Sequence, residues 1–160
     1  MQIKYIDGTR LQKAVHAGIN YVINRKDYLN KINVFPVPDG DTGTNMAYTL
    51  STIANEIKST SQKPISKMAE AISDSSLNGA RGNSGSILAQ FFVGFSEGCG
   101  SYNKLNPKRF SQAIQIAKDY SYDALSEPKE GTILSVIKDW ADSIHSLQKE
   151  HKDFITIFNG

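Results

Sequence analysis

Two aspartates, Asp39 and Asp41, stand two residues apart in the segment NVFPVPDGDTGTNM. Adjacent carboxylates repel each other unless a cation or a shared proton lies between them. Gly40 lets the backbone bend so that both carboxylates can face one side, which suits a hard cation bound by oxygen atoms. Because no His or Cys lies nearby, this pattern favours Mg²⁺ over zinc.

Two alternatives apply to the same segment. A calcium-binding EF-hand loop counted from Asp39 would need Gly at the sixth position and Glu at the twelfth, where this chain has Thr44 and Leu50. That alternative is excluded. An ordinary turn stays open, because PDG is a common turn signature and Asp41 can serve as the N-cap of the helix that follows.

A second glycine-rich segment, NGARGNSGS at residues 78–86, also precedes a helix. Its glycines allow close approach of a ligand, the free N–H groups of a helix start favour phosphate, and Arg81 can add a charged contact. A P-loop is excluded because the segment has no lysine, and a nucleophile elbow is excluded because Ser86 replaces its last glycine. A tight turn with Ser84 as a cap is the structural alternative.

A third segment, EPKEGTILSV, places Gly131 and Thr132 at another helix start, where Thr132 can simply be a capping residue. Three polar helix starts of this kind can converge on one rim of a helical barrel. The rim would then carry metal ligands on one loop and phosphate donors on another. The three segments together indicate a nucleotide site without a P-loop.

Apolar residues recur at helical spacing along most of the chain, and no segment shows sustained alternation with a period of two, so we predict an all-α fold. The fourth expected helix, rich in Ile, Leu and Phe, should be central because it is apolar on more than one side. Four of the expected helices cover about residues 9–31, 42–58, 107–125 and 131–149. The other two lie between them: one opens near Pro64 and ends at the NGARGNSG segment, and the next runs from that segment to GCG.

The composition indicates one soluble domain. The 160 residues are 39% hydrophobic and 21% charged, with a formal net charge of +2. We therefore expect no membrane span and no nucleic-acid partner. A single cysteine, Cys99, and an N-terminus without a signal-peptide pattern predict a cytoplasmic protein. The apolar tail HKDFITIFNG predicts that residues 1–160 are an incomplete part of a longer multidomain chain.

The segments NVFPVPDGDTGTNM, GARGNSGSILAQFFVGF and PKEGTIL, in this order, resemble the N-terminal ATP-binding domain of the bacterial fatty acid kinase A family. That domain is similar to the nucleotide-binding L subunit of dihydroxyacetone kinase. The resemblance runs through nearly the whole chain. It implies an antiparallel barrel of amphipathic helices, truncated here at its C-terminal end, with ATP and two Mg²⁺ ions bound at one end.

The resemblance also implies roles for individual residues. Asp39 and Asp41 would be the catalytic metal ligands that bridge to the phosphates. Dihydroxyacetone kinase relatives have a third aspartate before this pair, and Asn33 is the candidate for that place here. The implied nucleotide-binding residues are Thr42, Thr44, Gly82, Asn83, Ser84 and Thr132.

The resemblance implies a Mg²⁺-dependent kinase domain that serves conversion of fatty acids to acyl phosphates. A carboxylate acceptor needs no general base, and a separate fatty-acid-binding carrier protein would present it. Any homodimer would form through regions outside this chain, and the isolated piece can lack activity. The alternatives are a phosphotransfer subunit of the dihydroxyacetone kinase type and a non-catalytic helical interaction module.

Overall fold

The computed structural model describes residues 2–159, and this part of the chain is all-α, as predicted. Two very short strands accompany the helices. The elements are β1 (Ile6–Asp7), α1 (Gly8–Asn24), α2 (Lys26–Lys31), α3 (Thr42–Ser59), α4 (Ile65–Gly79), α5 (Gly82–Cys99), β2 (Lys104–Leu105), α6 (Pro107–Asp123), α7 (Ile133–Glu150) and α8 (Phe154–Asn159).

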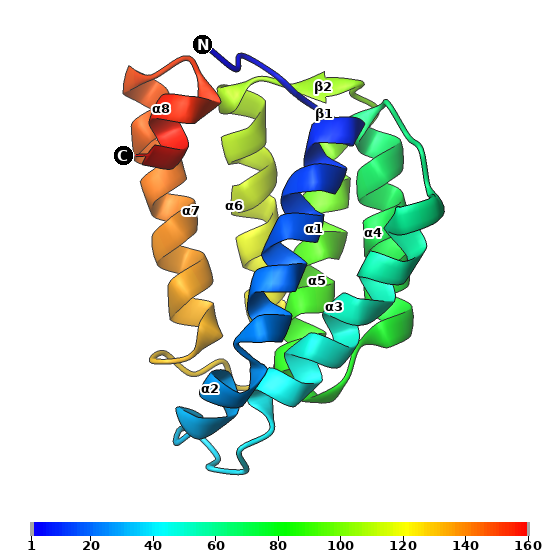
Figure 1. Ribbon diagram of the computed structural model, residues 1–160. Coiled ribbons are helices and arrows are strands. Elements are labelled where there is room, and N and C mark those ends of the chain that lie inside the picture. Colours follow the sequence, from blue (N-terminus) through cyan, green and yellow to red (C-terminus); the bar gives the residue numbers. More distant parts are fainter. Residues whose placement is uncertain (1, 160) are drawn as a thin grey trace.

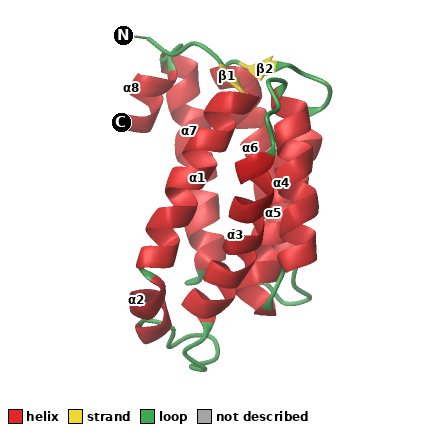
Figure 2. Cartoon of the chain, turned by 45° about the vertical axis from the view of Figure 1, so that its right-hand side comes forward, coloured by secondary structure: helices red, strands yellow, loops and turns green. Residues whose placement is uncertain are grey.

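The long helices α1 and α3 to α7 run alternately up and down, side by side (Figures 1 and 2). Helix α5 lies in the middle of this arrangement and contacts α3, α4 and α6. The expected central position of the most apolar helix is therefore confirmed. One end of the bundle holds β1, β2 and α8, and the other end holds α2 with the loops that precede α3, α5 and α7 (Figure 1).

The core forms where the apolar stripes of the helices meet. Ile53 and Ile57 of α3 and Met68 of α4 are fully buried in the main hydrophobic cluster. Helices α5 and α6 approach especially closely, because two glycines of α5 face two alanines of α6. A side-chain carbon added to Gly94 would lie 2.8 Å from the Ala117 Cα atom, and the corresponding distance from Gly98 to the Ala113 Cα atom is 2.5 Å.

The end opposite the loops is closed by contacts between distant parts of the chain. Strands β1 and β2 pair antiparallel, with Ile6 opposite Leu105. The Phe154 N–H at the start of α8 donates a hydrogen bond of 2.8 Å to the Ile3 carbonyl. Phe154 also packs edge-on against Phe110 of α6, with ring centroids 5.3 Å apart. The tail residues therefore belong to the folded bundle.

The structure corrects three predicted helix boundaries. The expected helix over residues 9–31 is divided at Arg25, whose backbone angles (φ −107°, ψ 8°) leave the helical range. The break lets α2 pack beneath α3, where a side chain at Gly43 would meet the Lys26 carbonyl. Pro64 lies just outside α4 as its N-cap. Helix α7 begins at Ile133 because Thr132 is its N-cap.

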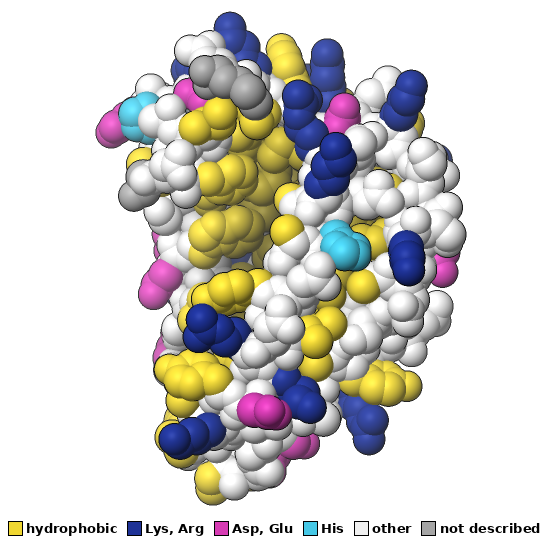
Figure 3. All heavy atoms as spheres, in the orientation of Figure 1, with side chains coloured by type: hydrophobic (Ala, Val, Ile, Leu, Met, Phe, Trp, Pro, Cys, Tyr) yellow, Lys and Arg dark blue, Asp and Glu magenta, His cyan; other side chains and the backbone are white. Residues whose placement is uncertain are grey.

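Hydrophobic side chains gather in a hollow between α1 on one side and α7 with α8 on the other (Figure 3). Trp140 of α7 and Phe158 of α8 are exposed aromatic residues. Both rings lie close to that of the core residue Phe110, with centroids 6.5 Å from Trp140 and 5.8 Å from Phe158. Within residues 2–159, none of the helices has the length and apolar character needed to cross a bilayer.

Candidate functional site

The three polar segments lie at the same end of the bundle (Figure 1). The Ser84 hydroxyl donates a hydrogen bond of 3.3 Å to the Thr42 carbonyl, which joins the start of α5 to the start of α3. A side-chain carbon added to Gly131 would lie 4.0 Å from the Phe35 ring, so the loop before α7 reaches the loop before α3. We call this end of the bundle, formed by residues 33–45, 80–85 and 126–132, the polar rim.

The start of α3 is capped by two asparagines that precede it. The Asn33 amide oxygen accepts hydrogen bonds from the Asp41 N–H (3.2 Å), the Thr42 N–H (3.3 Å) and the Thr42 hydroxyl (2.9 Å). The Asn30 amide oxygen accepts from the Thr44 N–H over 3.0 Å, and its NH₂ group donates to the Thr44 hydroxyl over 2.9 Å. These bonds satisfy most of the helix-start donors that would otherwise bind an anion.

The two aspartate carboxylates stay exposed on the rim. Asp41 occupies the N-cap position of α3, but its side chain makes no capping hydrogen bond. Among residues 2–159, neither Asp39 nor Asp41 forms a side-chain hydrogen bond or an ion pair. Gly40 between them has φ +66°, a conformation that favours glycine. The Asn33 contact, and not the Asp41 carboxylate, therefore performs the capping.

The start of α5 is open, in contrast to that of α3. Arg81 is the N-cap residue and provides no side-chain hydrogen bond. The first backbone bond of this helix runs from the Gly85 N–H to the Arg81 carbonyl. The N–H groups of Gly82, Asn83 and Ser84 consequently have no acceptor among the described residues. Three free N–H groups at the positive end of an 18-residue helix form a site for an anion such as phosphate.

The start of α7 is closed by its own residues. The Thr132 hydroxyl accepts a hydrogen bond from the Leu134 N–H (3.2 Å) and donates one to the Lys129 carbonyl (2.7 Å). The Gly131 N–H donates to the Ser135 hydroxyl over 2.8 Å. Thr132 therefore acts as a cap in this structure, and of the three helix starts on the rim, α5 offers the most free donors.

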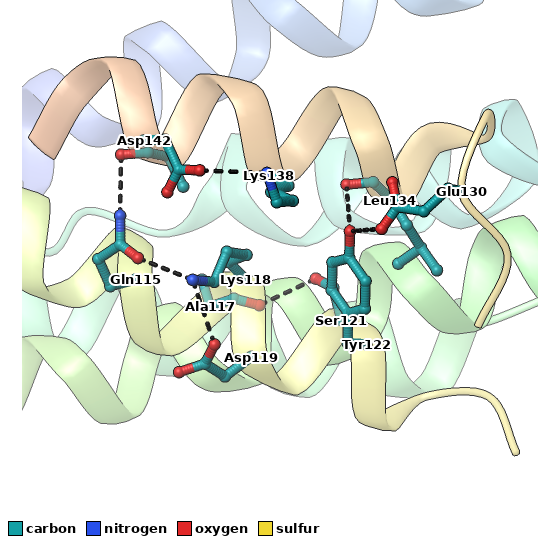
Figure 4. Close-up of polar contacts among 11 residues, drawn as sticks. Gln115, Ala117, Lys118, Asp119, Ser121, Tyr122, Glu130, Leu134, Lys138 and Asp142 are labelled. Atoms are coloured by element: carbon teal, nitrogen blue, oxygen red, sulfur yellow. Dashed lines mark hydrogen bonds and ion pairs between the residues drawn. The ribbon is translucent and has the colours of Figure 1, made fainter. Parts of the chain in front are cut away.

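A carboxylate holds the loop before α7 in place. The Tyr122 hydroxyl donates to the Glu130 carboxylate over 2.8 Å (Figure 4). The Ser135 hydroxyl donates to the second oxygen of the same carboxylate. The hydrogen bond from Ser135, followed by that from Tyr122, lowers the pKa of Glu130 below its ordinary value. Burial, followed by the contact with Glu130, raises the pKa of Tyr122 to about 12. Sequence reasoning missed Glu130, because nothing in EPKEGT distinguishes it from a solvated charge.

One positive charge lies beside the open helix start. The Arg81 guanidinium rests over the Tyr48 ring of α3, 5.1 Å from its centroid. Both side chains are exposed, so Arg81 is held by a contact that costs little to break. Arg81 can therefore swing toward an anion bound at Gly82 to Ser84.

Within residues 2–159, no three His, Cys, Asp or Glu side chains come together as a metal cluster. The donor set on the rim, two unpaired carboxylates, fits Mg²⁺, which commonly takes one or two carboxylates and completes its shell with phosphate oxygens and water. A surface groove of about 430 Å³ lies elsewhere, between α3 and α4, and its lining, which includes Thr52, Glu70 and Asn78, shares no residue with the rim.

The fold and the rim define an all-α domain that combines an open helix start with adjacent unpaired carboxylates. Residues 36–160 match the family model described as the DAK2 domain. The chain therefore belongs to the DAK2 domain family, whose members resemble the L subunit of dihydroxyacetone kinase.

Several bacterial proteins are similar to this chain. Protein YloV of Bacillus subtilis strain 168 is 38% identical over 157 residues, which are 98% of this chain and 28% of that protein. An uncharacterized protein of Staphylococcus saprophyticus is 37% identical over 155 residues, or 97% of this chain and 28% of that protein. An uncharacterized protein of Staphylococcus aureus strain USA300 is 36% identical with the same coverage. The chain thus spans about 28% of the length of these relatives.

Proposed function

We propose that this domain binds ATP together with Mg²⁺ at the polar rim and serves a kinase that phosphorylates fatty acids. The observation that carries the proposal is the open N-terminus of α5 next to two carboxylates that lack partners. The Ser84–Thr42 hydrogen bond, 3.3 Å long, holds these two features together. Membership in the DAK2 domain family supports a nucleotide-binding, phosphotransfer type of module.

In this proposal Asp39 and Asp41 hold the metal, which supplies charge neutralisation at the terminal phosphates when bound. Their carboxylates are available because other groups cap α3. In the proposal Asn33 caps helix α3 and is not a third ligand of the metal. Its amide oxygen already accepts three hydrogen bonds, so it fixes the backbone of Asp41 relative to Thr42.

The phosphate chain would bind at the start of α5. The N–H groups of Gly82, Asn83 and Ser84 donate to phosphate oxygens, and the positive φ of Gly82 (+62°) sets their direction. The exposed Thr44 hydroxyl accepts from Asn30 and keeps its own hydrogen for a phosphate oxygen. Thr42 and Thr132 would border the site with hydroxyls that are already hydrogen-bonded.

The proposed acceptor is a fatty acid carboxylate presented by a separate carrier protein. Dihydroxyacetone is the alternative acceptor, and the family match itself suggests it. In both cases the residues of the rim position and neutralise the phosphates, and no covalent protein intermediate is required. Full-length protein supplied with ATP and either a fatty-acid-loaded carrier or dihydroxyacetone distinguishes the two. Acyl phosphate formation supports the fatty acid reaction, and phosphorylation of dihydroxyacetone alone contradicts it.

The nucleotide proposal is tested by calorimetric titration of ATP or ADP into this chain with and without Mg²⁺. We expect saturable binding that requires the metal and is lost in Asp39→Asn and Asp41→Asn. Asp119→Asn, the same chemical change at an exposed site in the C-terminal part of α6, is the control. Binding that survives both rim substitutions contradicts the proposal.

A further inference from the structure

Helix α3 turns a polar stripe toward the start of α5. Its members, Thr42, Asn45 and Thr49, are three and four residues apart and so share one helix face. The Thr42 carbonyl accepts from the Ser84 hydroxyl, and the Thr49 hydroxyl accepts from the Arg81 N–H over 3.3 Å. Two members of the stripe are therefore bonded to the segment that opens α5.

Asn45, which lies between Thr42 and Thr49 on this stripe, differs from them in its hydrogen bonding. The residue is only 8% exposed, yet its side-chain amide forms no hydrogen bond among the described residues. The amide keeps a small opening to solvent, since within residues 2–159 no fully buried side-chain nitrogen or oxygen lacks a partner. The amide is therefore open to water in the free domain and available to a ligand.

The Asn45 amide is aimed at the open helix start. A side-chain carbon added to Gly82 would lie 2.4 Å from the Asn45 Nδ2 atom, so this amide rests directly on the Gly82 backbone. The free N–H groups of Gly82, Asn83 and Ser84 belong to the same turn. The Asn45 amide therefore lies beside the turn whose N–H groups are free.

We propose that the Asn45 side-chain amide donates a hydrogen bond to a phosphate oxygen of the nucleotide at the start of α5; this rests on the proposed function. Asn45 was not among the residues that sequence reasoning selected. In this role its amide remains without a protein partner in the free domain and gains one from the ligand.

The proposal predicts that substitution of Asn45 changes the affinity for the ligand and not the stability of the free domain. Titration of Mg²⁺ with ADP into Asn45→Ala should show an affinity about ten-fold lower than wild type, the effect of losing one good hydrogen bond to a charged oxygen. Asn45→Asp should bind still more weakly, because it places a negative charge against phosphate. The melting temperature of ligand-free Asn45→Ala should change little, since the amide has no hydrogen bond within residues 2–159 and only its packing on Gly82 is lost.

Asn55→Ala, a substitution at an exposed position of the same helix, is the matched control. It should leave the affinity unchanged and should raise the melting temperature only by the helix propensity of alanine. The ¹⁵N–¹H spectrum of wild type gives a second readout. Its Asn45 side-chain signals are assigned by their loss from the spectrum of Asn45→Asp. These signals should shift when Mg²⁺ and ADP are added to wild type.

The outcomes distinguish failure of the proposed function from failure of the proposed role of Asn45. Wild type that binds no Mg²⁺–ADP refutes the proposed nucleotide function. Wild type that binds, with Asn45→Ala of equal affinity or with unshifted Asn45 signals, refutes the role of Asn45 alone. A lower melting temperature of ligand-free Asn45→Ala with unchanged affinity assigns Asn45 a structural role and also overturns the proposal.

Discussion

The Asn33 amide oxygen lies 3.2 Å from the Asp41 backbone nitrogen and accepts its hydrogen bond. This contact caps α3 from a residue eight positions earlier in the chain. A helix that begins at an aspartate would ordinarily use that aspartate as its cap. Here the cap comes from Asn33, and the Asp41 carboxylate remains available on the rim.

Substitution of Asn33 measures this capping directly. Asn33→Ala removes the acceptor for three donors and should lower the free energy of unfolding by about 1–2 kcal/mol, the usual effect of losing a helix cap. Asn33→Asp keeps an acceptor oxygen and should be milder. Urea unfolding of the ligand-free protein gives both values. A variant of unchanged stability but reduced Mg²⁺ affinity would instead support Asn33 as the third metal ligand.

The carboxylate of Glu130 predicts a pH effect. Its pKa is lowered below the ordinary 4.5, mainly by the hydrogen bond from Ser135. A lowered folded-state pKa stabilises the protein above the unfolded value, and this contribution disappears as the pH falls through the folded value. The melting temperature of wild type should therefore exceed that of Glu130→Gln at neutral pH, and the difference should close as the pH falls below about 4.

One matched control completes the pH experiment. Glu127→Gln removes a negative charge from the same loop and is the control for charge alone. The pKa of Asp153 is also lowered, mainly by the Thr156 hydroxyl, so Asp153 contributes to acid unfolding of both wild type and Glu130→Gln. A difference between these two proteins that persists unchanged to pH 3 would show that Glu130 acts by packing alone.

Substitution of glycine by alanine should have opposite effects on stability at Gly94 and at Gly18. At Gly94 the added carbon meets Ala117 of α6 at 2.8 Å, and such overpacking should destabilise the protein by about 1–3 kcal/mol. Nothing lies within 4 Å of a side chain at Gly18, an exposed position within α1. Gly18→Ala should stabilise the protein by about 0.5–1 kcal/mol through helix propensity. Chemical unfolding measures both, and equal signs would contradict the close packing of α5 on α6.

The reactivity of Cys99 should report unfolding. Burial raises the pKa of this thiol to about 12 and shields it within the core. A thiol reagent such as dithionitrobenzoate should therefore label the native protein very slowly at pH 8, and rapidly once denaturant unfolds it. The absorbance of the released thiolate gives the rate. Rapid labelling of native protein would place Cys99 outside the core.

The sequence predicts the fold well because the apolar stripes are long and regular. The starts of α3 and α6 lie where Thr42 and Pro107 indicated. The break at Arg25 could not be predicted, because VINRKDYL contains neither glycine nor proline and the break depends on packing of α2 against Gly43. The paired strands are two residues long, too short to produce a recognisable alternation.

The site was predictable only in outline. The three glycine-bearing segments indicated a shared rim, and the structure brings them together. Which helix start is open depends on Asn30 and Asn33, whose capping contacts span up to 14 residues and leave no local signature. The roles of Asp39 and Asp41 as metal ligands stay predictions.

The open start of α5 has a consequence for hydrogen exchange. The N–H groups of residues 82–84 have no acceptor in the described part of the chain, yet they begin a helix that is packed against three others. These amides should exchange with deuterated water quickly in the free domain, although the rest of the helix exchanges slowly. A fall in deuterium uptake confined to this turn would record the arrival of an anion without any label or change to the protein.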